Sequence, residues 1–249
     1  MYLRRFCIPA FCFVLVAVSP AAAPKNVLFL FSDDQRADTI AALGNPHLTT
    51  PNLDRLVRGG TTFTRAYCMG GMQGAICVPS RAMLMTGRTL FRVKEQLDGQ
   101  PTWPEQFAAA GYTTFVTGKW HNGAKSVARV FASGSAIFLG GMTDPYKAVV
   151  QDLSPAHELV NKRTVAKHSV ETFADAAAGF LRAQKDAPAP FLCYVAFNAP
   201  HDPRVAPPEW HTRANAALPP APANFLPVHP FNNGALNIRD ELQIGRAHV

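Results

Sequence analysis

Asn26-Val-Leu-Phe-Leu-Phe-Ser-Asp-Asp34 gives the first indication of the fold class. Its unbroken apolar run predicts a strand buried on both faces, as in a parallel sheet, and the run ends in two carboxylates. Two further runs share this design: Pro190–Phe197 leads into Asn198-Ala-Pro-His201, and Thr113–Thr117 leads into Gly118-Lys-Trp-His121. Because ligands bind at the carboxyl ends of strands in open α/β sheets, we expect these polar groups to share one site.

Helical patterns lie between the expected strands. The expected helices run from Thr50-Pro51 to Gly59-Gly60, from Pro79 to about Thr86, over Pro104–Ala110 and over Ser169–Gln184. This alternation predicts a mostly parallel, doubly wound α/β sheet with helices on both faces. Thr61–Tyr67 is expected to form a short strand. Ala124–Ala166, with its glycines, prolines and mixed polarity, is expected to form loops with short elements on the substrate side.

The N-terminus has the pattern of a cleaved signal peptide. A short cationic start precedes Phe6–Val18, which is apolar but short for a membrane span, and Ala21–Ala23 supplies small residues for cleavage. We therefore expect residues 1–23 to be removed, in preference to an uncleaved membrane anchor. Residues 24–249 would then be exported to a periplasmic or extracellular location. No later segment is apolar enough for a stable membrane span.

The 249-residue chain carries a formal net charge of +7, but its basic residues are scattered. This distribution lacks the basic cluster that binds nucleic acid, and it favours at most a modest attraction of anionic substrates. Removal of the signal peptide leaves three cysteines, Cys68, Cys77 and Cys193. An odd number of cysteines in an oxidising compartment indicates that one thiol has a special role.

Cys77 is the first candidate for that role. It precedes a helix whose first turn contains Pro79, so backbone N–H groups and the positive end of the helix dipole lie near the thiol. Arg81, one turn further, can present a planar guanidinium to an oxyanion. These residues predict an activated nucleophile beside an anion site. The alternative is a disulfide between Cys77 and either Cys68 or Cys193, which is the commoner state of exported cysteines.

The sequence from Cys77 onward resembles the sulfatase signature. Cys77–Arg81 matches its Cys-x-Pro-Ser-Arg core, and the following Leu-Met-Thr-Gly-Arg continues the match. Asn26–Asp34, Thr50–Leu56, Gly118–His121 and Ala199–His201 also resemble sulfatase segments, in the family's order. The resemblance implies an alkaline-phosphatase-like fold and hydrolysis of sulfate monoesters. A phosphate or phosphonate ester hydrolase of the same superfamily is the alternative.

The resemblance also implies that Cys77 is modified. In sulfatases a formylglycine-generating maturation system oxidises this cysteine to an aldehyde, whose hydrate carries two hydroxyls on one carbon. One hydroxyl attacks the sulfur of the ester and becomes sulfated, and deprotonation of the other expels sulfate and restores the aldehyde. Serine or an unmodified cysteine has no second hydroxyl, so release of sulfate would need a separate hydrolysis.

Asp33 and Asp34 indicate a metal site. Two adjacent carboxylates repel each other unless a cation lies between them, and oxygen ligands suit Ca²⁺ or Mg²⁺. A solvated acidic turn is the alternative reading of such a pair. The resemblance to sulfatases implies calcium, held by Asp33 and Asp34 and in contact with the residue made from Cys77.

Three further residues match sulfatase positions. Lys119 and His121 alternate, so both side chains would point to one face if the strand geometry persists. The resemblance implies that Lys119 contacts the sulfate and that His121 lies near the formylglycine hydroxyl, where it would be the base for elimination. It places His201 on the sulfate and leaving-group side.

The pattern also departs from the family. Sulfatases usually complete the metal site with a later Asp and an Asn or His, and they supply a second active-site lysine from downstream. No segment after His201 matches these family positions. We therefore expect residues 24–249 to be the N-terminal portion of a truncated catalytic domain whose C-terminal part is missing. An inactive fragment that at most binds anions is the remaining alternative.

Overall fold

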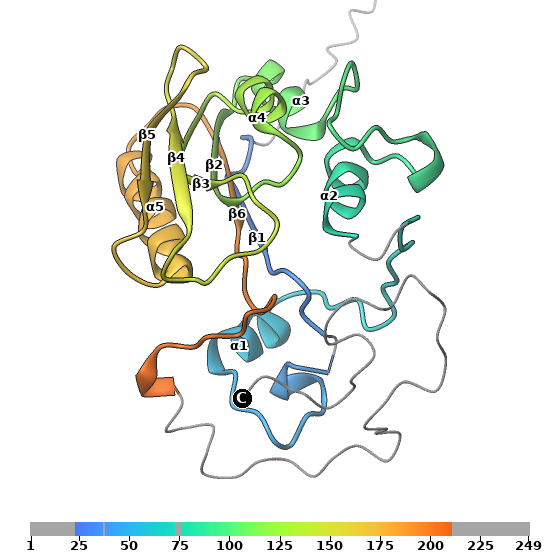
Figure 1. The fold of residues 1–249 in the computed structure, drawn as a ribbon. Coiled ribbons are helices and arrows are strands. Elements are labelled where there is room, and N and C mark those ends of the chain that lie inside the picture. The colour runs from blue at the N-terminus through green and yellow to red at the C-terminus, as the bar shows by residue number, and fades with distance from the viewer. Residues whose placement is uncertain (1–22, 37, 73–75, 211–249) are drawn as a thin grey trace, which may run out of the picture.

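The computed structural model describes residues 23–36, 38–72 and 76–210, which build a six-stranded sheet in the order β1-β6-β2-β3-β4-β5 (Figure 1). The strands are β1 (Val27–Phe31), β2 (Thr113–Lys119), β3 (Ser133–Phe138), β4 (Val149–Leu153), β5 (Leu159–Thr164) and β6 (Phe191–Ala196). β1, β6, β2 and β3 are parallel, and β4 and β5 extend the sheet in antiparallel pairing. The predicted mostly parallel sheet is confirmed.

Helices cover both faces of the sheet, as predicted. They are α1 (Pro51–Gly59), α2 (Cys77–Thr86), α3 (Trp103–Ala109), α4 (Ala124–Val130) and α5 (Ser169–Ala183), with 3₁₀ turns at Ala41–Leu43 and Leu90–Arg92. α5 packs on one face, where Ala177 joins Phe115. α2 and α4 lie on the opposite face, where Met85 and Val127 join Val116. Because successive strand side chains point to opposite faces, Phe115 and Val116 belong to different layers of the core.

β1 lies at the edge of the described sheet, so the prediction that it is buried on both faces is wrong there. Phe29 and Phe31 pack against the core, and Phe29 stacks on Tyr194 of β6 at 5.4 Å between ring centroids. Leu28 and Leu30 point to the other face and are 47% and 52% exposed. Although every residue of β1 is apolar, successive side chains therefore alternate between a partly buried and an exposed environment. β6, which lies between β1 and β2, and β2 itself are buried on both faces.

The segment Ala124–Ala166 is more regular than the loops with short elements that the sequence predicts. It contains α4, β3, β4 and β5, and β5, the outer strand, ends in four exposed polar residues. Register shifts interrupt the β3–β4 and β4–β5 pairing and break the two-residue periodicity on which a sequence reading depends. The predicted strand at Thr61–Tyr67 is wrong as well: this exposed segment is not paired with any strand of the described residues.

The other predicted elements agree closely with the structure. α1, α3 and α5 match the expected helices within about two residues, the usual uncertainty of helix ends. α2 begins at Cys77, two residues earlier than predicted, so the thiol lies in the first helical turn. Residues 1–22 of the predicted signal peptide lie outside the described residues. In the described part of the chain, none of the helices combines the length and apolar character that a membrane crossing requires.

Candidate active site

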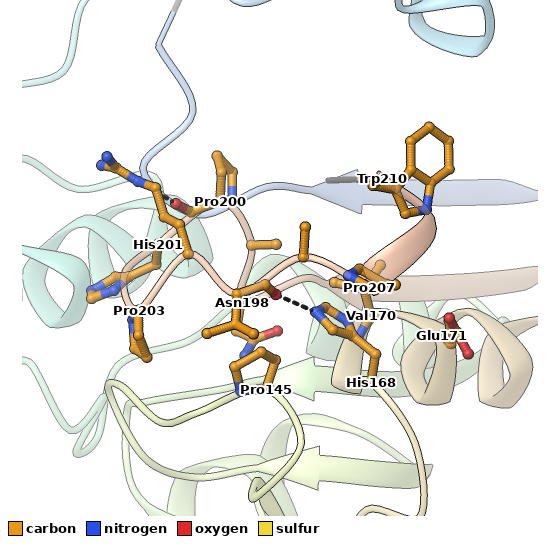
Figure 2. A pocket seen from close by; sticks show the side chains of 14 residues that line it. Pro145, His168, Val170, Glu171, Asn198, Pro200, His201, Pro203, Pro207 and Trp210 are labelled. Atoms are coloured by element: carbon orange, nitrogen blue, oxygen red, sulfur yellow. Dashed lines mark hydrogen bonds between the residues drawn. The ribbon is translucent and has the colours of Figure 1, made fainter. Parts of the chain in front are cut away.

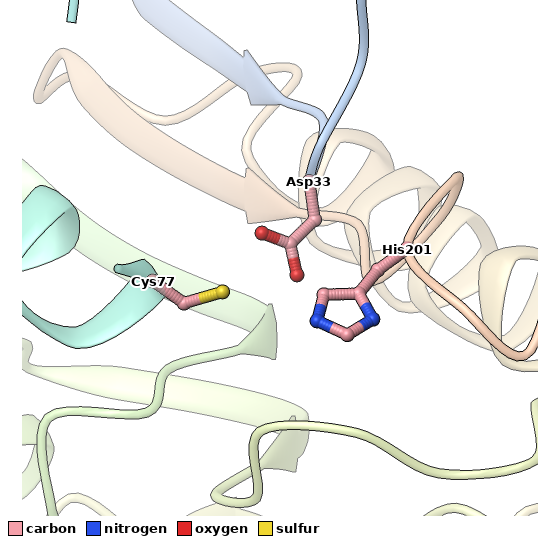
Figure 3. Close-up of side chains that lie close together, drawn as sticks. All are labelled: Asp33, Cys77 and His201. Atoms are coloured by element: carbon pink, nitrogen blue, oxygen red, sulfur yellow. The ribbon is translucent and has the colours of Figure 1, made fainter. Parts of the chain in front are cut away.

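The carboxyl ends of three parallel strands meet the start of one helix. Asp33 follows β1, Lys119 ends β2, His201 follows β6, and Cys77 opens α2. A carboxylate oxygen of Asp33, the sulfur of Cys77 and a ring nitrogen of His201 all lie within 4.8 Å of one another. Figure 3 shows these three side chains directed toward a common centre. The structure thus brings together the strand ends that the sequence assigned to one site.

Asp33 lies between two buried cations. Its carboxylate pairs with the Lys119 ammonium at 2.5 Å and with the Arg81 guanidinium at 3.4 Å, and all three side chains are at most 7% exposed. Nη1 of Arg81 also donates to the backbone carbonyl of Lys119 at 2.6 Å. Buried charges are tolerated when they are paired in this way. Because two cations share one carboxylate, the group keeps one net positive charge, which favours an anionic ligand.

Arg81 retains unused hydrogen-bonding capacity. Its Nε and Nη2 atoms are buried and have no hydrogen-bond partner among the described residues, although Nη2 is within ion-pair range of Asp33. The guanidinium lies over the ring of Phe31, 5.0 Å from its centroid. Buried donors without an acceptor are costly, so an oxyanion placed against them would be stabilised. The predicted oxyanion contact of Arg81 is consistent with this arrangement.

His201 is surrounded by hydrogen-bonding and acidic groups. Its Nδ1 lies 2.7 Å from the backbone carbonyl of Asp202 and 3.2 Å from the Asp202 carboxylate. Its Nε2 lies 3.5 Å from the carboxylate of Asp34. A hydrogen bond with Cys77 raises the pKa of His201 to about 9, helped by the Asp202 carbonyl and the Asp34 charge. With an unmodified Cys77, His201 is therefore an imidazolium at neutral pH.

His121 is held as a neutral imidazole. Burial, with the nearby charges of Lys119 and Arg81, lowers the pKa of His121 to about 4. The strand geometry expected to place Lys119 and His121 on one face does not persist: β2 ends at Lys119, and His121 has a left-handed backbone with φ +67°. Gly118, within β2, has a φ of +90°, and only glycine fits there because a Cβ would collide with the Ala196 carbonyl.

The described cysteines are all free. Cys68 is exposed, whereas Cys193 lies inside β6, where burial raises the pKa of its thiol to about 12. Neither is bonded to Cys77, whose sulfur faces Asp33 and His201 instead. The structure therefore contains no disulfide among its described residues, contrary to the alternative reading of Cys77.

A pocket of about 520 Å³ adjoins the site on the α5 side (Figure 2). His201 lines one part of it, and most other walls are apolar, including Pro145, Val205 and Trp210. The segment after β6 that forms one wall is tied to the start of α5, because Nε2 of His168 is hydrogen-bonded to the Val205 carbonyl at 2.9 Å. The pocket therefore offers apolar surface beside a charged centre.

The sequence as a whole matches a known family. A sequence model described as Sulfatase matches residues 25–233, which is most of the chain. The chain belongs to the sulfatase family. Arylsulfatase A of Bos taurus is 40% identical over 121 residues, covering 44% of this chain and 23% of the relative. N-acetylgalactosamine-6-sulfatase of Rattus norvegicus is 29% identical over 220 residues, covering 75% of this chain and 41% of the relative.

Solved structures show the same sulfatase fold. BT4656, in complex with its substrate D-glucosamine-2-N,6-O-disulfate, superposes with a TM-score of 0.65 and 25% identity, over 80% of this chain and 39% of that one. Ps i-CgsB, in complex with k-i-k-neocarrahexaose, has a TM-score of 0.60 and 23% identity, over 76% and 48%. The sulfatase chain described here thus spans less than half the length of each of these four relatives.

The acidic residues of this sulfatase site suit a hard cation. Asp33, Cys77 and His201 form one group of potential ligands, and Asp34, His201 and Asp202 form a second, so His201 links the two predicted carboxylates. Carboxylate oxygens suit Ca²⁺ and Mg²⁺, whereas a thiol sulfur suits softer metals. The carboxylates therefore fit a hard cation, whereas the sulfur of Cys77 does not. Asp34 also has a left-handed backbone, φ +58°, of a kind that clusters at functional sites.

Two residues at this site were not predicted from the sequence. Asp202 contacts His201, and the only sequence signal for it is an acidic residue directly after a candidate histidine. Asn122 is completely buried after His121 and donates to backbone carbonyls of two other segments. Its partners are main-chain groups distant in sequence, so no local pattern indicates this role.

Proposed function

We propose that this chain is the part of an exported sulfatase that carries the nucleophile, made from Cys77 by conversion to formylglycine. The observation that carries the proposal is the position of Cys77. Its sulfur lies at the start of a helix, within 4.8 Å of ligand atoms of Asp33 and His201, beside the buried cations of Arg81 and Lys119. A nucleophile directed at a sulfate monoester needs this combination of a fixed position and positive charge.

The cations of the chain would bind the sulfate. Lys119 and Arg81 provide the positive charge, and the unpartnered Nε and Nη2 of Arg81 provide donors for sulfate oxygens. The first turn of α2 adds backbone N–H groups and the positive end of the helix. Since the positive charge is fixed before substrate arrives, no reorganisation is needed as charge shifts onto the leaving oxygen.

The two histidines would divide the proton transfers. His121, neutral because its pKa is lowered to about 4, can accept a proton from a hydroxyl of residue 77. His201 lies on the pocket side, where it can contact the ester oxygen of the leaving alcohol, and the apolar pocket beside it would receive the organic part of the ester.

Calcium and the maturation system complete the proposed site. Asp33 and Asp34 would hold Ca²⁺ together with oxygen of the converted residue 77, and the ion would neutralise charge on the sulfate and on the nucleophile. A formylglycine-generating system is the partner that the Cys77 motif requires, and export to the periplasm or exterior follows from the signal-peptide pattern.

Peptide mass spectrometry tests the proposal. The chain would be expressed in a host with formylglycine-generating activity, alongside a sulfatase known to be converted there. Conversion of Cys77 lowers the mass of its tryptic peptide by about 18 Da, because a thiol is exchanged for an aldehyde. An intact Cys77, with the reference sulfatase converted, would refute the mechanism. Paired sulfate and phosphate esters of one leaving group then decide between a sulfatase and a phosphate ester hydrolase.

A further inference from the structure

Asn122 joins the segment after β2 to the helix that carries the nucleophile. Its side chain is fully buried, and its Nδ2 donates to the backbone carbonyl of Val78 at 3.0 Å and to that of Glu95 at 2.7 Å. Both partners can only accept hydrogen bonds, so the amide nitrogen must face them. Val78 directly follows Cys77 in the first turn of α2.

A second bond between the same two segments lies one turn along the helix. Nη1 of Arg81 donates to the Lys119 carbonyl at 2.6 Å. The segment from Lys119 to Asn122 therefore holds α2 at Val78 and again at Arg81, and Cys77 directly precedes the first of these two points. Near its start, α2 is also attached through Arg81, whose guanidinium pairs with the Asp33 carboxylate at 3.4 Å.

We infer that Asn122 is a positioning residue that fixes residue 77 relative to Lys119 and His121. The inference rests on the proposed function for its catalytic consequence, but the placement of Cys77 can be tested without turnover. Substitution of Asn122 tests the contact between the segment after β2 and α2 without removing a charge, whereas substitution of Arg81 would also disturb its ion pair with Asp33. The Oδ1 of Asn122 has no hydrogen-bond partner among the described residues, so the two donor contacts account for the described hydrogen bonds of its side chain.

The test compares Asn122→Leu with Ser126→Ala. Leucine fills a similar volume but cannot donate to the Val78 and Glu95 carbonyls. Ser126 is buried in α4. Its hydroxyl accepts from Trp120 Nε1 at 2.8 Å and donates to the backbone carbonyl of Asn122 at 2.6 Å, and among the described residues it makes no hydrogen bond to α2. Ser126→Ala therefore perturbs the same buried region, including the backbone of Asn122, but leaves the side-chain hydrogen bonds of Asn122 to Val78 and Glu95 in place.

Two measurements are made on each variant. In unconverted protein, the rate of Cys77 alkylation by iodoacetamide is followed by peptide mass spectrometry, with exposed Cys68 as an internal reference. Asn122→Leu should change the Cys77 rate by at least about 3-fold at constant Cys68 rate. In converted protein, kcat per formylglycine should fall about 10- to 100-fold with KM nearly unchanged, because small displacements of a nucleophile carry losses of this size. Ser126→Ala should change neither.

The outcomes separate this inference from the proposed function. If the converted wild-type protein has no sulfatase activity, the proposed function fails, and the alkylation rates still decide whether Asn122 positions Cys77. Alkylation rates in Asn122→Leu equal to those in Ser126→Ala would overturn the inference. If Asn122→Leu does not fold, Asn122→Ala replaces it. Failure of both variants to fold, with Ser126→Ala folded, would assign Asn122 a purely structural role and also overturn the inference.

Discussion

Asp33→Asn would leave the ammonium of Lys119 and the guanidinium of Arg81 buried without the anion that they share. At an effective dielectric constant near 20, the carboxylate attracts the charge at 2.5 Å by roughly 7 kcal/mol and that at 3.4 Å by roughly 5 kcal/mol. Desolvation of three groups that are at most 7% exposed offsets most of this attraction. Removing one partner of such a buried pair typically costs about 3–5 kcal/mol, a large part of the stability of a domain.

The assay is urea unfolding at pH 7 in the presence of a chelator, so that metal binding does not contribute. Asp33→Asn should lower the free energy of unfolding by about 3–5 kcal/mol. Lys119→Met removes one cation, and the double variant should be less unstable than the sum of the single losses by about 0.5–3 kcal/mol. Asp38→Asn is the control, because Asp38 pairs with Arg36 in solvent and its loss should leave stability unchanged. Equal midpoints for the Asp33 and Asp38 variants would refute the reasoning.

Two further predictions follow from the geometry around β2. Because the folded-state pKa of His121, about 4, lies below its ordinary value of 6.5, the unfolded chain binds more protons in that interval, and stability is lost as the pH falls from about 6.5 to about 4. His121→Gln should flatten this part of a melting-temperature profile, and parallel profiles for variant and wild type would contradict the assignment. Gly118→Ala should abolish cooperative folding, since its Cβ would collide with the Ala196 carbonyl, whereas Gly179→Ala in α5, with open space around the new Cβ, should fold normally by circular dichroism. A well-folded Gly118→Ala protein would show that the turn tolerates a side chain.

Elements with a strong local signature could be predicted from the sequence. α5 has an amphipathic pattern over Ser169–Ala183, and α1 begins with proline at its first position. β6 is an unbroken apolar run because it lies between two other strands. β3, β4 and β5 could not be predicted in the same way, because bulges interrupt their pairing and the outermost strand is polar on its exposed side.

The sequence predicted which residues belong to the candidate site, but not how their side chains pair or which of them carry a proton. Cys77 and Arg81 are part of a continuous motif, and Lys119 and His201 follow recognisable strands. Their protonation and pairing depend on burial and on neighbours from other segments. The pKa of His121, for example, is lowered by burial and by the charges of Lys119 and of Arg81, which belongs to a different segment.

The sequence by itself determined the family, the mostly parallel sheet and the residues that gather at its carboxyl edge. These properties are encoded in short stretches, because strand and helix periodicities depend on near neighbours. The tertiary structure alone decided that Asp33 pairs with Lys119, 86 residues away, and that Asn122 reaches Val78, 44 residues away. It also decided that Leu28 and Leu30 face outward from an edge strand. Burial and charge pairing are set by segments brought together in folding, and no local pattern of residues carries that information.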